Sequence, residues 1–568
     1  MKQIIECVPN FSEGRDMAVI NAITDEIKRG GEVSLLDVDP GEATNRTVVT
    51  FVGEPKAVME AAFRGMKKAA ELIDMRKHHG AHPRMGATDV CPFIPVSGIT
   101  LQECAQLARD FAKRVSAELA IPTYCYEAAA FTPERKNLAV CREGEYEGLP
   151  ERMTKEGKAP DFGDRPFDEG VAKTGATAVG ARDFLIAVNF NLNTTSTRRA
   201  NAIAFDVREK GRPMREGGKL TGKPVKDAQG NTVMIPGTLK GTKAIGWYID
   251  EYGIAQVSMN ITDMAETPLH KAFDEVSRAA RERGLRVTGT EIVGLVPKRA
   301  LIEAGEHYLR MQQRSLGIPE SEILKIAVKS MGLDELKPFV AEEKVIEYML
   351  DAGKEKGKKL VDMTLTAFAD ETASESPAPG GGSIAAYMGQ LGAALGTMVA
   401  NLSAHKAGWD DRWEEFSDAA KKGRGIIDRL NLLVDEDTEA FNRIMAVFSM
   451  PKSTPEEKAA RAAALEEATL YACQVPLRTM KTSYEAFDLL EQMAANGNPA
   501  SISDVGVGAL AARSAVIGAY LNVKINAAGL KNWDNAYKIL DEAKAIAESA
   551  EKREKAILHS VEKIISKE

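Results

Sequence analysis

The strand patterns of this chain stop near residue 335, and this break constrains the fold more than any other feature. Before it, apolar runs with a period of two alternate with segments whose apolar residues recur every 3.6 positions. From 340 to 568 only helical periodicity remains, interrupted by "SPAPGGGS", "SMPKSTP" and "ANGNPAS". Since 568 residues are too many for one hydrophobic core, the sequence predicts a multidomain protein: an α/β (α+β) part followed by an all-α helical bundle.

The α/β part repeats one order of elements. Residues 1–120 read β-α-β-β-α-β-α, with strand-like runs "QIIECVPNF", "VSLLDVDP", "RTVVTFVG" and "DVCPFIPVS". The same order returns from "FLIAVNFNL" to a helix near 298–315, around an insertion rich in Gly, Lys and Pro at 211–243. Two βαββαβ units in series predict two ferredoxin-like lobes. We expect lobes at residues 1–180 and 181–332, a linker at 333–342 and the helical domain at 343–568.

This topology predicts a polar rim in the first lobe. In a βαββαβ unit, strands 1 and 2 run parallel and strands 3 and 4 run the other way. The ends of the first two strands and the starts of the last two therefore share one sheet edge. The polar residues at these four places are Asn10 and Ser12, Asp37 and Asp39, Thr44, Asn45 and Arg46, and the histidine-rich loop with Asp89.

That loop, "RKHHGAHPRMGATDVCPF" at 76–93, contains three of the chain's seven histidines, His78, His79 and His82. A helical zinc site would use the His78 and His82 spacing, but Gly80 and Pro83 disfavour a helix and no HExxH is present. We therefore expect no metal site. A histidine on a rim with Asp and Arg suits general-base chemistry. Pro83 restricts the backbone of His82, which favours that residue, and we expect the other two histidines at the surface of a helix end.

A glycine-rich turn opens the longest uncharged stretch of the helical domain, "PAPGGGSIAAYMG". Gly380, Gly381 and Gly382 lead into Ser383, an expected N-cap, and free backbone N–H groups at such an entry can hold an anion. The turn is not a Walker loop, because GK[ST] is absent. The alternative is close helix packing, for which Gly389, Gly392 and Gly396 leave room. Both interpretations stay open.

An aspartate interrupts the apolar stripe of "RLNLLVDEDTEAFNRIMAVF", residues 429–448. Asp437 falls within the stripe, whereas Asp435 and Glu436 point elsewhere. Burial of a carboxyl group raises its pKa, which can make it a proton donor near neutral pH. The alternative is a buried ion pair, for example with Arg478 or Arg513.

Charge and cysteine use exclude several classes of protein. The net charge of −8 argues against a nucleic-acid binder, and six scattered cysteines without a CxxC pair indicate reduced thiols in the cytoplasm. The start "MKQIIECVPNFSEG" lacks the apolar region of a signal peptide. Residues 383–403 carry no charge, but their period of 3.6 favours a buried helix over a membrane span.

Longer motifs add a family resemblance. "ECVPNFSEGRD", "LLDVDPGEATNRTVVTFVG", "HHGAHPRMGATDVCPFIPV" and "GATAVGARDFLIAVNFNL" resemble the glutamate formiminotransferase family. "SPAPGGGSIAAYMGQLGAALGTMV", "LLVDEDTEAF", "MPKSTPEEK" and "GAYLNVKIN" resemble the formiminotetrahydrofolate cyclodeaminase family. In this order, they are similar to the bifunctional family that carries out two steps of histidine degradation. The resemblance implies transfer of a formimino group from N-formimino-L-glutamate to tetrahydrofolate. It then implies cyclisation to 5,10-methenyl-tetrahydrofolate with release of ammonia.

The resemblance also assigns residues and partners. It implies that His82 is the transferase base, that Asp437 is the cyclodeaminase acid and that the co-substrate is polyglutamated tetrahydrofolate, without a metal. It implies a homo-oligomer, an octamer in the family. We expect Asp39 or Asp89 to orient the base and Arg46 to hold a substrate carboxylate. Three alternatives remain: a cyclohydrolase in the second domain, a non-catalytic folate-binding scaffold and a histidine-metal hydrolase. The family's folate-binding loop corresponds to residues 163–175, where this chain is longer than the family pattern. The candidate folate-binding residues of this segment are Gly163, Asp164, Arg165, Pro166, Phe167 and Gly175.

Overall fold

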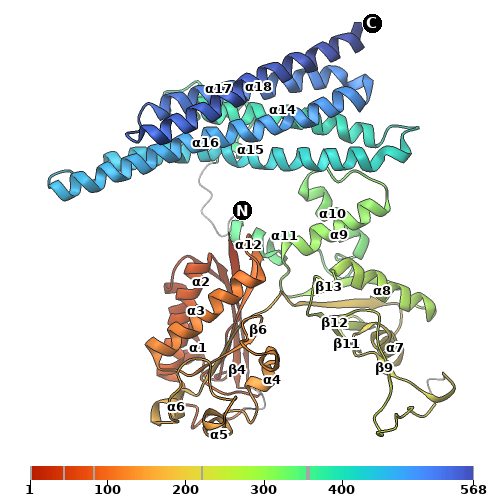
Figure 1. Ribbon diagram of the computed structural model, residues 1–568. Helices are drawn as coiled ribbons and strands as arrows, with labels where there is room; N and C mark the ends of the chain where they lie inside the picture. Colours follow the sequence, from red (N-terminus) through yellow and green to blue (C-terminus); the bar gives the residue numbers. More distant parts are fainter. Residues whose placement is uncertain (1–2, 43–44, 81–82, 219–221, 353–358, 567–568) are drawn as a thin grey trace. The chain divides into compact units, whose positions relative to one another are not determined.

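The computed structural model describes residues 3–42, 45–80, 83–218, 222–352 and 359–566. The chain forms two compact units (Figure 1). The first comprises Met1–Ala300 and Gly332–Lys354, and the second comprises Leu301–Met331 and Glu355–Glu568. The division agrees with the predicted change from an α/β part to a helical part.

The first sheet has seven strands and contains the predicted order of elements. Strand β1 lies between β4 and β5, and β3 pairs with the outer side of β4, all antiparallel. Beyond β5 the sheet continues in parallel through β7 and β6, two strands that the sequence patterns did not reveal. The strands are β1 (Ile4–Cys7), β2 (Asn10–Phe11), β3 (Val33–Gly41), β4 (Arg46–Gly53), β5 (Thr88–Ser97), β6 (Thr123–Glu127) and β7 (Thr177–Ala181).

Helices cover one face of this sheet (Figure 1). They are α1 (Met17–Arg29), α2 (Pro55–Leu72) and α3 (Leu101–Leu119). Alternate strand residues such as Ile5, Phe51 and Phe93 are fully buried against them, as the period of two requires. A smaller core around Tyr124 and Leu149 packs under three short helices, α4 (Leu138–Cys141), α5 (Leu149–Thr154) and α6 (Glu169–Thr174).

The second sheet repeats the predicted order with four antiparallel strands, arranged β11-β12-β8-β13. Helix α7 packs on β11 and β12, and α8 packs on β13. In its described residues, the insertion contains two short paired strands, β9 (Arg212–Pro213) and β10 (Met234–Ile235). The main elements are β8 (Ile186–Leu192), α7 (Thr197–Val207), β11 (Thr242–Ile249), β12 (Ile254–Ile261), α8 (Leu269–Glu282) and β13 (Val287–Val293).

The segment between the sheets and the bundle belongs partly to each unit. Helices α9 (Lys298–Met311) and α10 (Glu320–Met331) lie mostly in the second unit. Residues 332–352, with α11 (Ala341–Lys344) and α12 (Ile346–Ala352), return to the first, where the Asn191 amide donates to Glu335 (2.5 Å). The predicted boundaries at 180, 332 and 342 stay predictions, while the contacts place 301–331 with the bundle.

The described part of the second unit contains helices and no strands. The long helices begin or end at the predicted breakers. Small residues bring them close together: a Cβ at Gly392 would lie 2.9 Å from the backbone of Gly508 and Ala512 on the neighbouring helix. The helices are α13 (Leu365–Thr372), α14 (Gly381–Ala404), α15 (Trp413–Phe448), α16 (Pro455–Asn496), α17 (Ile502–Ala527) and α18 (Trp533–Ser566).

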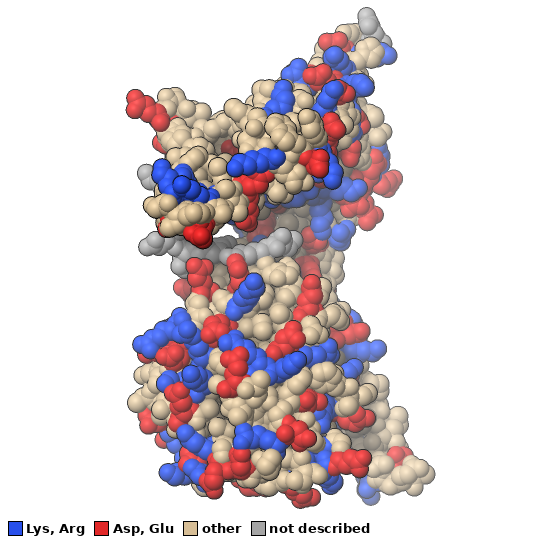
Figure 2. Space-filling view, turned by 60° about the vertical axis from the view of Figure 1, so that its left-hand side comes forward, with Lys and Arg blue, Asp and Glu red and all other residues tan. Residues whose placement is uncertain are grey.

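Two described helical stretches, Gly381–Ala404 and Pro499–Ala527, are long and apolar enough to cross a membrane. Within the unit, 56% and 50% of their most apolar windows are buried, and core helices of soluble proteins have the same length and composition. On the face shown in Figure 2, Lys and Arg side chains are interspersed with Asp and Glu.

Candidate functional site

Asn45 joins the loops of the polar rim in the first unit. Its backbone is left-handed (φ 48°), a conformation that asparagine tolerates better than most residues. The side-chain oxygen accepts from the Gly14 amide (3.0 Å), and the side-chain nitrogen donates to the His79 carbonyl (2.9 Å). The Ser12 hydroxyl donates to the Gly86 carbonyl (2.8 Å). The structure therefore brings together the loop after β2, the turn before β4 and the histidine loop.

The three histidines of that loop have different surroundings. Residues 81–82, and with them the predicted base His82, lie outside the described residues. His79 is exposed, as expected. The prediction for His78 was wrong: only 7% of its surface is exposed, and its Nε2 lies 2.8 Å from the Asn45 carbonyl oxygen. Its partners come from a turn 33 positions away and from Arg84, neither of which helix-end periodicity can reveal.

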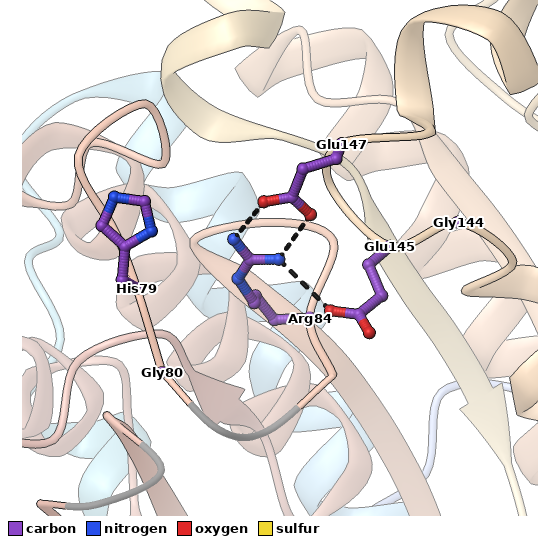
Figure 3. Close-up of a pocket in the computed structure, with 6 residues that line it drawn as sticks. All are labelled: His79, Gly80, Arg84, Gly144, Glu145 and Glu147. Atoms are coloured by element: carbon purple, nitrogen blue, oxygen red, sulfur yellow. Dashed lines mark hydrogen bonds and ion pairs between the residues drawn. The ribbon is translucent and has the colours of Figure 1, made fainter.

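A cavity of about 460 Å³ opens beside the histidine loop (Figure 3). Arg84 lies between His79 and the glutamates, and its guanidinium donates to both oxygens of Glu147 (2.6 and 2.7 Å) and to Glu145 (3.2 Å). This contact lowers the pKa of Glu147 to about 2. The cavity is therefore a polar, charged space lined by described residues of the histidine loop.

Four of the predicted rim residues, Asn10, Asp39, Arg46 and Asp89, differ in burial. Asp89 is fully buried, accepts from the Met85 amide (3.0 Å) and forms an ion pair with Arg142. Burial raises the pKa of Asp89, and the positive charge of Arg142 opposes this shift. Burial lowers the pKa of Arg46, and the negative charges of Asp89 and Asp39 oppose that shift. Asp39 itself is exposed. Asn10 is buried and donates to the Val8 carbonyl (3.0 Å).

The predicted folate segment, 163–175, joins the histidine segment at its C-terminal end. The Ala87 amide donates to the Thr174 carbonyl (2.7 Å), and the Met75 amide donates to the Lys173 carbonyl (2.9 Å). Gly175 (φ 66°) has no room for a side chain, since a Cβ would lie 2.2 Å from the Met85 oxygen. The two predicted parts of the transferase site are therefore adjacent.

The other residues of this segment form its N-terminal half. Gly163 (φ 79°) lies against Ser116, and Arg165 donates to the Ala120 carbonyl (3.2 Å) and pairs with Asp168, which caps α6. The Phe167 ring lies 6.3 Å from the ring of Tyr146. Asp164 and Pro166 lie between these contacts in the chain.

In the second unit, Asp437 on α15 lies directly against the glycine turn at the start of α14. One carboxylate oxygen, Oδ2, accepts from the Ser383 amide (3.0 Å) and hydroxyl (3.4 Å). A Cβ at Gly382 would lie 2.0 Å from the other oxygen, Oδ1. Burial raises the pKa of Asp437, and the hydrogen bonds from Ser383 oppose this shift. The arrangement presents a half-buried carboxyl group that can be protonated more readily than an exposed one.

Two details of this second constellation differ from expectation. The N-cap of α14 is Gly380, whereas Ser383 lies in the first turn, where its hydroxyl donates to the Val434 carbonyl (2.8 Å). Arg478 pairs with Glu436 (2.6 Å), not with Asp437. Arg478 lies on α16 and reaches Glu436 on α15, and a linear pattern does not resolve which of two neighbouring carboxylates an arginine on another helix contacts.

Among the described residues, no group of three or more His, Cys, Asp or Glu side chains could hold a metal ion. The sequence patterns did not single out two arginines of the first site, and they placed Asn45 on the rim without giving it a role. Arg84 pairs with Glu147, and Arg142 pairs with the predicted rim residue Asp89. Asn45 was named only as part of a loop, although its side chain donates to the His79 carbonyl. The signal for Asn45 was its position before β4; Arg142 lies in a segment without regular periodicity.

Three family models match the chain in succession. Residues 4–182 match "Formiminotransferase domain, N-terminal subdomain", 187–351 match "Formiminotransferase domain" and 364–545 match "Formiminotransferase-cyclodeaminase". The mouse (Mus musculus) protein named formimidoyltransferase-cyclodeaminase is 42% identical over 527 residues, 93% of either chain. The chain belongs to the formimidoyltransferase-cyclodeaminase family.

Shorter relatives match each part of this family member separately. Glutamate formimidoyltransferase of Streptococcus pyogenes serotype M1 is 42% identical over 312 residues, covering 55% of this chain and 95% of its own. Methenyltetrahydrofolate cyclohydrolase of Methylorubrum extorquens is 39% identical over 187 residues, covering 33% of this chain and 90% of its own. The family's two parts thus also occur as separate proteins.

Proposed function

We propose that this family member catalyses two consecutive reactions of histidine degradation on a folate substrate. The first moves the formimino group from N-formimino-L-glutamate to tetrahydrofolate. The second converts 5-formimino-tetrahydrofolate to 5,10-methenyl-tetrahydrofolate with release of ammonia. The relatives' names and the three successive family matches support both activities.

One observation carries the proposal furthest: each candidate constellation is assembled within its own unit. The histidine loop, the rim and the 163–175 segment share hydrogen bonds in the first unit. In the second, the Asp437 carboxyl lies on the turn that contains Gly382. Residues far apart in sequence meet in both places.

In the transfer step, the attacking folate nitrogen must lose a proton and the leaving glutamate nitrogen must gain one. We assign this exchange to His82, whose ordinary pKa near 6.5 suits a general base. Arg46 is the proposed partner of a substrate carboxylate, with Asp39 on the adjacent strand. Asp89 is already held by Arg142, so we assign it to maintaining the rim and not to contact with the base.

In the cyclisation step, the second folate nitrogen attacks the formimino carbon and the imine nitrogen departs as ammonia. Departure requires a proton on that nitrogen. We assign this proton to Asp437, whose pKa is raised by burial. The Ser383 donors hold Oδ2, which leaves Oδ1 to carry the proton.

Several further properties belong to the same proposal. We assign each four-strand βαββαβ arrangement to a ferredoxin-like lobe, on the strand orders β5-β1-β4-β3 and β13-β8-β12-β11. We propose a cytoplasmic homo-oligomer, an octamer as in the family, that takes polyglutamated tetrahydrofolate. The proposal includes no metal, nucleic acid or membrane as partner.

The test is a coupled assay on two variants. With N-formimino-L-glutamate and tetrahydrofolate, the wild type should produce 5,10-methenyl absorbance and ammonia. His82→Ala should lose transfer but still deaminate added 5-formimino-tetrahydrofolate, and Asp437→Asn should do the reverse. A variant that kept both activities near wild-type rates would remove the role assigned to its residue.

A second candidate function concerns the helical unit alone, because one relative of this part is named a cyclohydrolase. A cyclohydrolase would add water to the 5,10-methenyl ring and release no ammonia. Supplying 5,10-methenyl-tetrahydrofolate and following the loss of its absorbance distinguishes the two functions. We expect ammonia release from the formimino substrate to exceed this hydrolysis.

A further inference from the structure

The chain on both sides of residues 81–82 is anchored. On the N-terminal side, the Asn45 side chain donates to the His79 carbonyl (2.9 Å), and His78 contacts the Asn45 carbonyl. On the C-terminal side, Arg84 is 8% exposed and is held by Glu147 and Glu145. Only four residues, 80–83, separate the two anchored positions.

His78 links the two anchors directly. Its Nε2 lies 2.8 Å from the Asn45 carbonyl oxygen, which can only accept, so Nε2 carries the hydrogen. Its Nδ1 lies 3.4 Å from the Arg84 Nε–H, which can only donate, so Nδ1 carries none. The two partners together select one neutral tautomer of the imidazole.

We propose that His78 is a positioning residue of the transferase site, whose neutral Nε2–H tautomer joins the turn at Asn45 to Arg84 at the edge of the cavity. The inference rests on the proposed transfer function. A displacement of about 1 Å in a reacting group can lower a rate about 100-fold, so loosening the described residues that flank the base in sequence should slow the transfer.

This arrangement makes the position sensitive to acid. A proton on Nδ1 would point an N–H at the Arg84 N–H, and the imidazolium would face the guanidinium charge. The charged groups around His78 are Arg84, His79 and Glu13; the first two oppose protonation and Glu13 favours it. Burial contributes most to the lowered pKa of His78. Acid therefore breaks the link to Arg84, in addition to protonating the base.

Two substitutions separate the hydrogen bonds from the titration. Glutamine has one N–H donor for Asn45 and one oxygen acceptor for Arg84, but it does not titrate. His78→Gln should retain transferase kcat/KM within about threefold of the wild type, whereas His78→Ala should lose about 100-fold, mainly in kcat. Deamination of added 5-formimino-tetrahydrofolate should be unchanged in both, which reports that the second unit of each variant is folded. His559→Gln, at an exposed histidine of the second unit, is the control.

The pH profile provides the readout that a purely structural role would not change. Below the lowered pKa of His78, log kcat/KM of the wild type should fall with a slope approaching 2, because both histidines must lose a proton. In His78→Gln the slope should stay near 1. A slope of 1 in the wild type, full activity in His78→Ala, or an inactive His78→Gln with intact deaminase would each overturn the inference. If the wild type transferred no formimino group, the proposed function would fail instead.

Discussion

Glu6 on β1 is a buried carboxyl group to which the proposed chemistry gives no role. Its surface is 5% exposed, and burial raises its pKa from 4.5 to about 7, against the attraction of Arg182. Between pH 4.5 and 7 the folded protein therefore binds a proton that the unfolded chain releases. The free energy of unfolding should fall as pH rises through this window, by up to about 3 kcal/mol.

Glu6→Gln should remove this pH dependence, because glutamine keeps the size of the side chain but does not ionise. We expect the urea midpoint for loss of transferase activity to be higher in the variant at pH 8 and similar in the two proteins at pH 4.5. Equal midpoints at pH 8 would show that water or Arg182 already compensates the buried charge.

For single residues, the sequence predicted candidate chemistry, such as an acid at Asp437, better than it predicted hydrogen-bond and ion-pair partners. Asp437 was placed on a buried face by its position in an apolar stripe; in the structure it is half-buried, and burial raises its pKa. His78 was placed at the surface, because its hydrogen-bond partner Asn45 lies 33 positions away. The alternative ion pair for Asp437 was not found, since Arg478 reaches Glu436 on the adjacent face. Burial follows from periodicity, but the choice of partner depends on tertiary packing.

The contact between the 163–175 segment and β5 depends on two facing glycines, Gly86 and Gly175. Gly175→Ala introduces a Cβ about 2.2 Å from the Met85 oxygen at a φ of 66°, so the two segments must separate. We expect the KM for tetrahydrofolate in the transfer reaction to rise at least tenfold, a loss of about 1.4 kcal/mol in binding.

Gly253→Ala is the matched control, because Gly253 has a similar φ of 65° and open space around its Cα. It should cost some stability through its backbone but leave the KM for tetrahydrofolate unchanged. The same KM in both variants would exclude the 163–175 segment from folate binding.

At the start of α14, Gly382 likewise has no room for a side chain. Gly382→Ala would place a methyl group where the Asp437 carboxylate lies, about 2.0 Å from Oδ1. The carboxylate would have to leave the Ser383 amide, and we expect deaminase kcat to fall about 100-fold while transfer continues. Gly425→Ala on α15 is the control, since a Cβ there meets nothing within 4 Å and alanine favours a helix. Normal deamination in Gly382→Ala would argue against this geometry.

At the scale of elements, periodicity predicted the helices and strands of both lobes to within a few residues. The predicted "RTVVTFVG" strand is β4, and the helix expected at 267–283 is α8. Strands β6 and β7 were missed because "TYCYE" and "TAVGA" are short, and lie among irregular segments without an alternating pattern.

At the scale of the molecule, the chain passes between its two units more often than a linear domain plan predicts. Residues 301–331 belong to the second unit, and 332–354 return to the first. Local sequence patterns cannot show this. Helices α9 and α10 have the periodicity of ordinary amphipathic helices, and the residues that they pack against lie about 100 positions later in the chain. Gly317 is an example: it lies so close to α15 that a Cβ would be 2.3 Å from Ala420.

Cutting the chain at the predicted boundary should therefore weaken the helical unit. A fragment of residues 343–568 lacks three hydrogen bonds that residues 315–317 form with α14 and α15: Ser315 to Asn401 (2.6 Å), Asn401 to Gly317 (2.9 Å) and Leu316 to Ser417 (3.1 Å). It also exposes the site of buried Leu316. At about 1 kcal/mol for each hydrogen bond, with the apolar burial added, we expect its free energy of unfolding to be about 3–5 kcal/mol below that of residues 301–568. Urea unfolding of both fragments, followed by circular dichroism, measures the difference. Equal midpoints and slopes would mean that residues 301–331 are held by the first unit in solution.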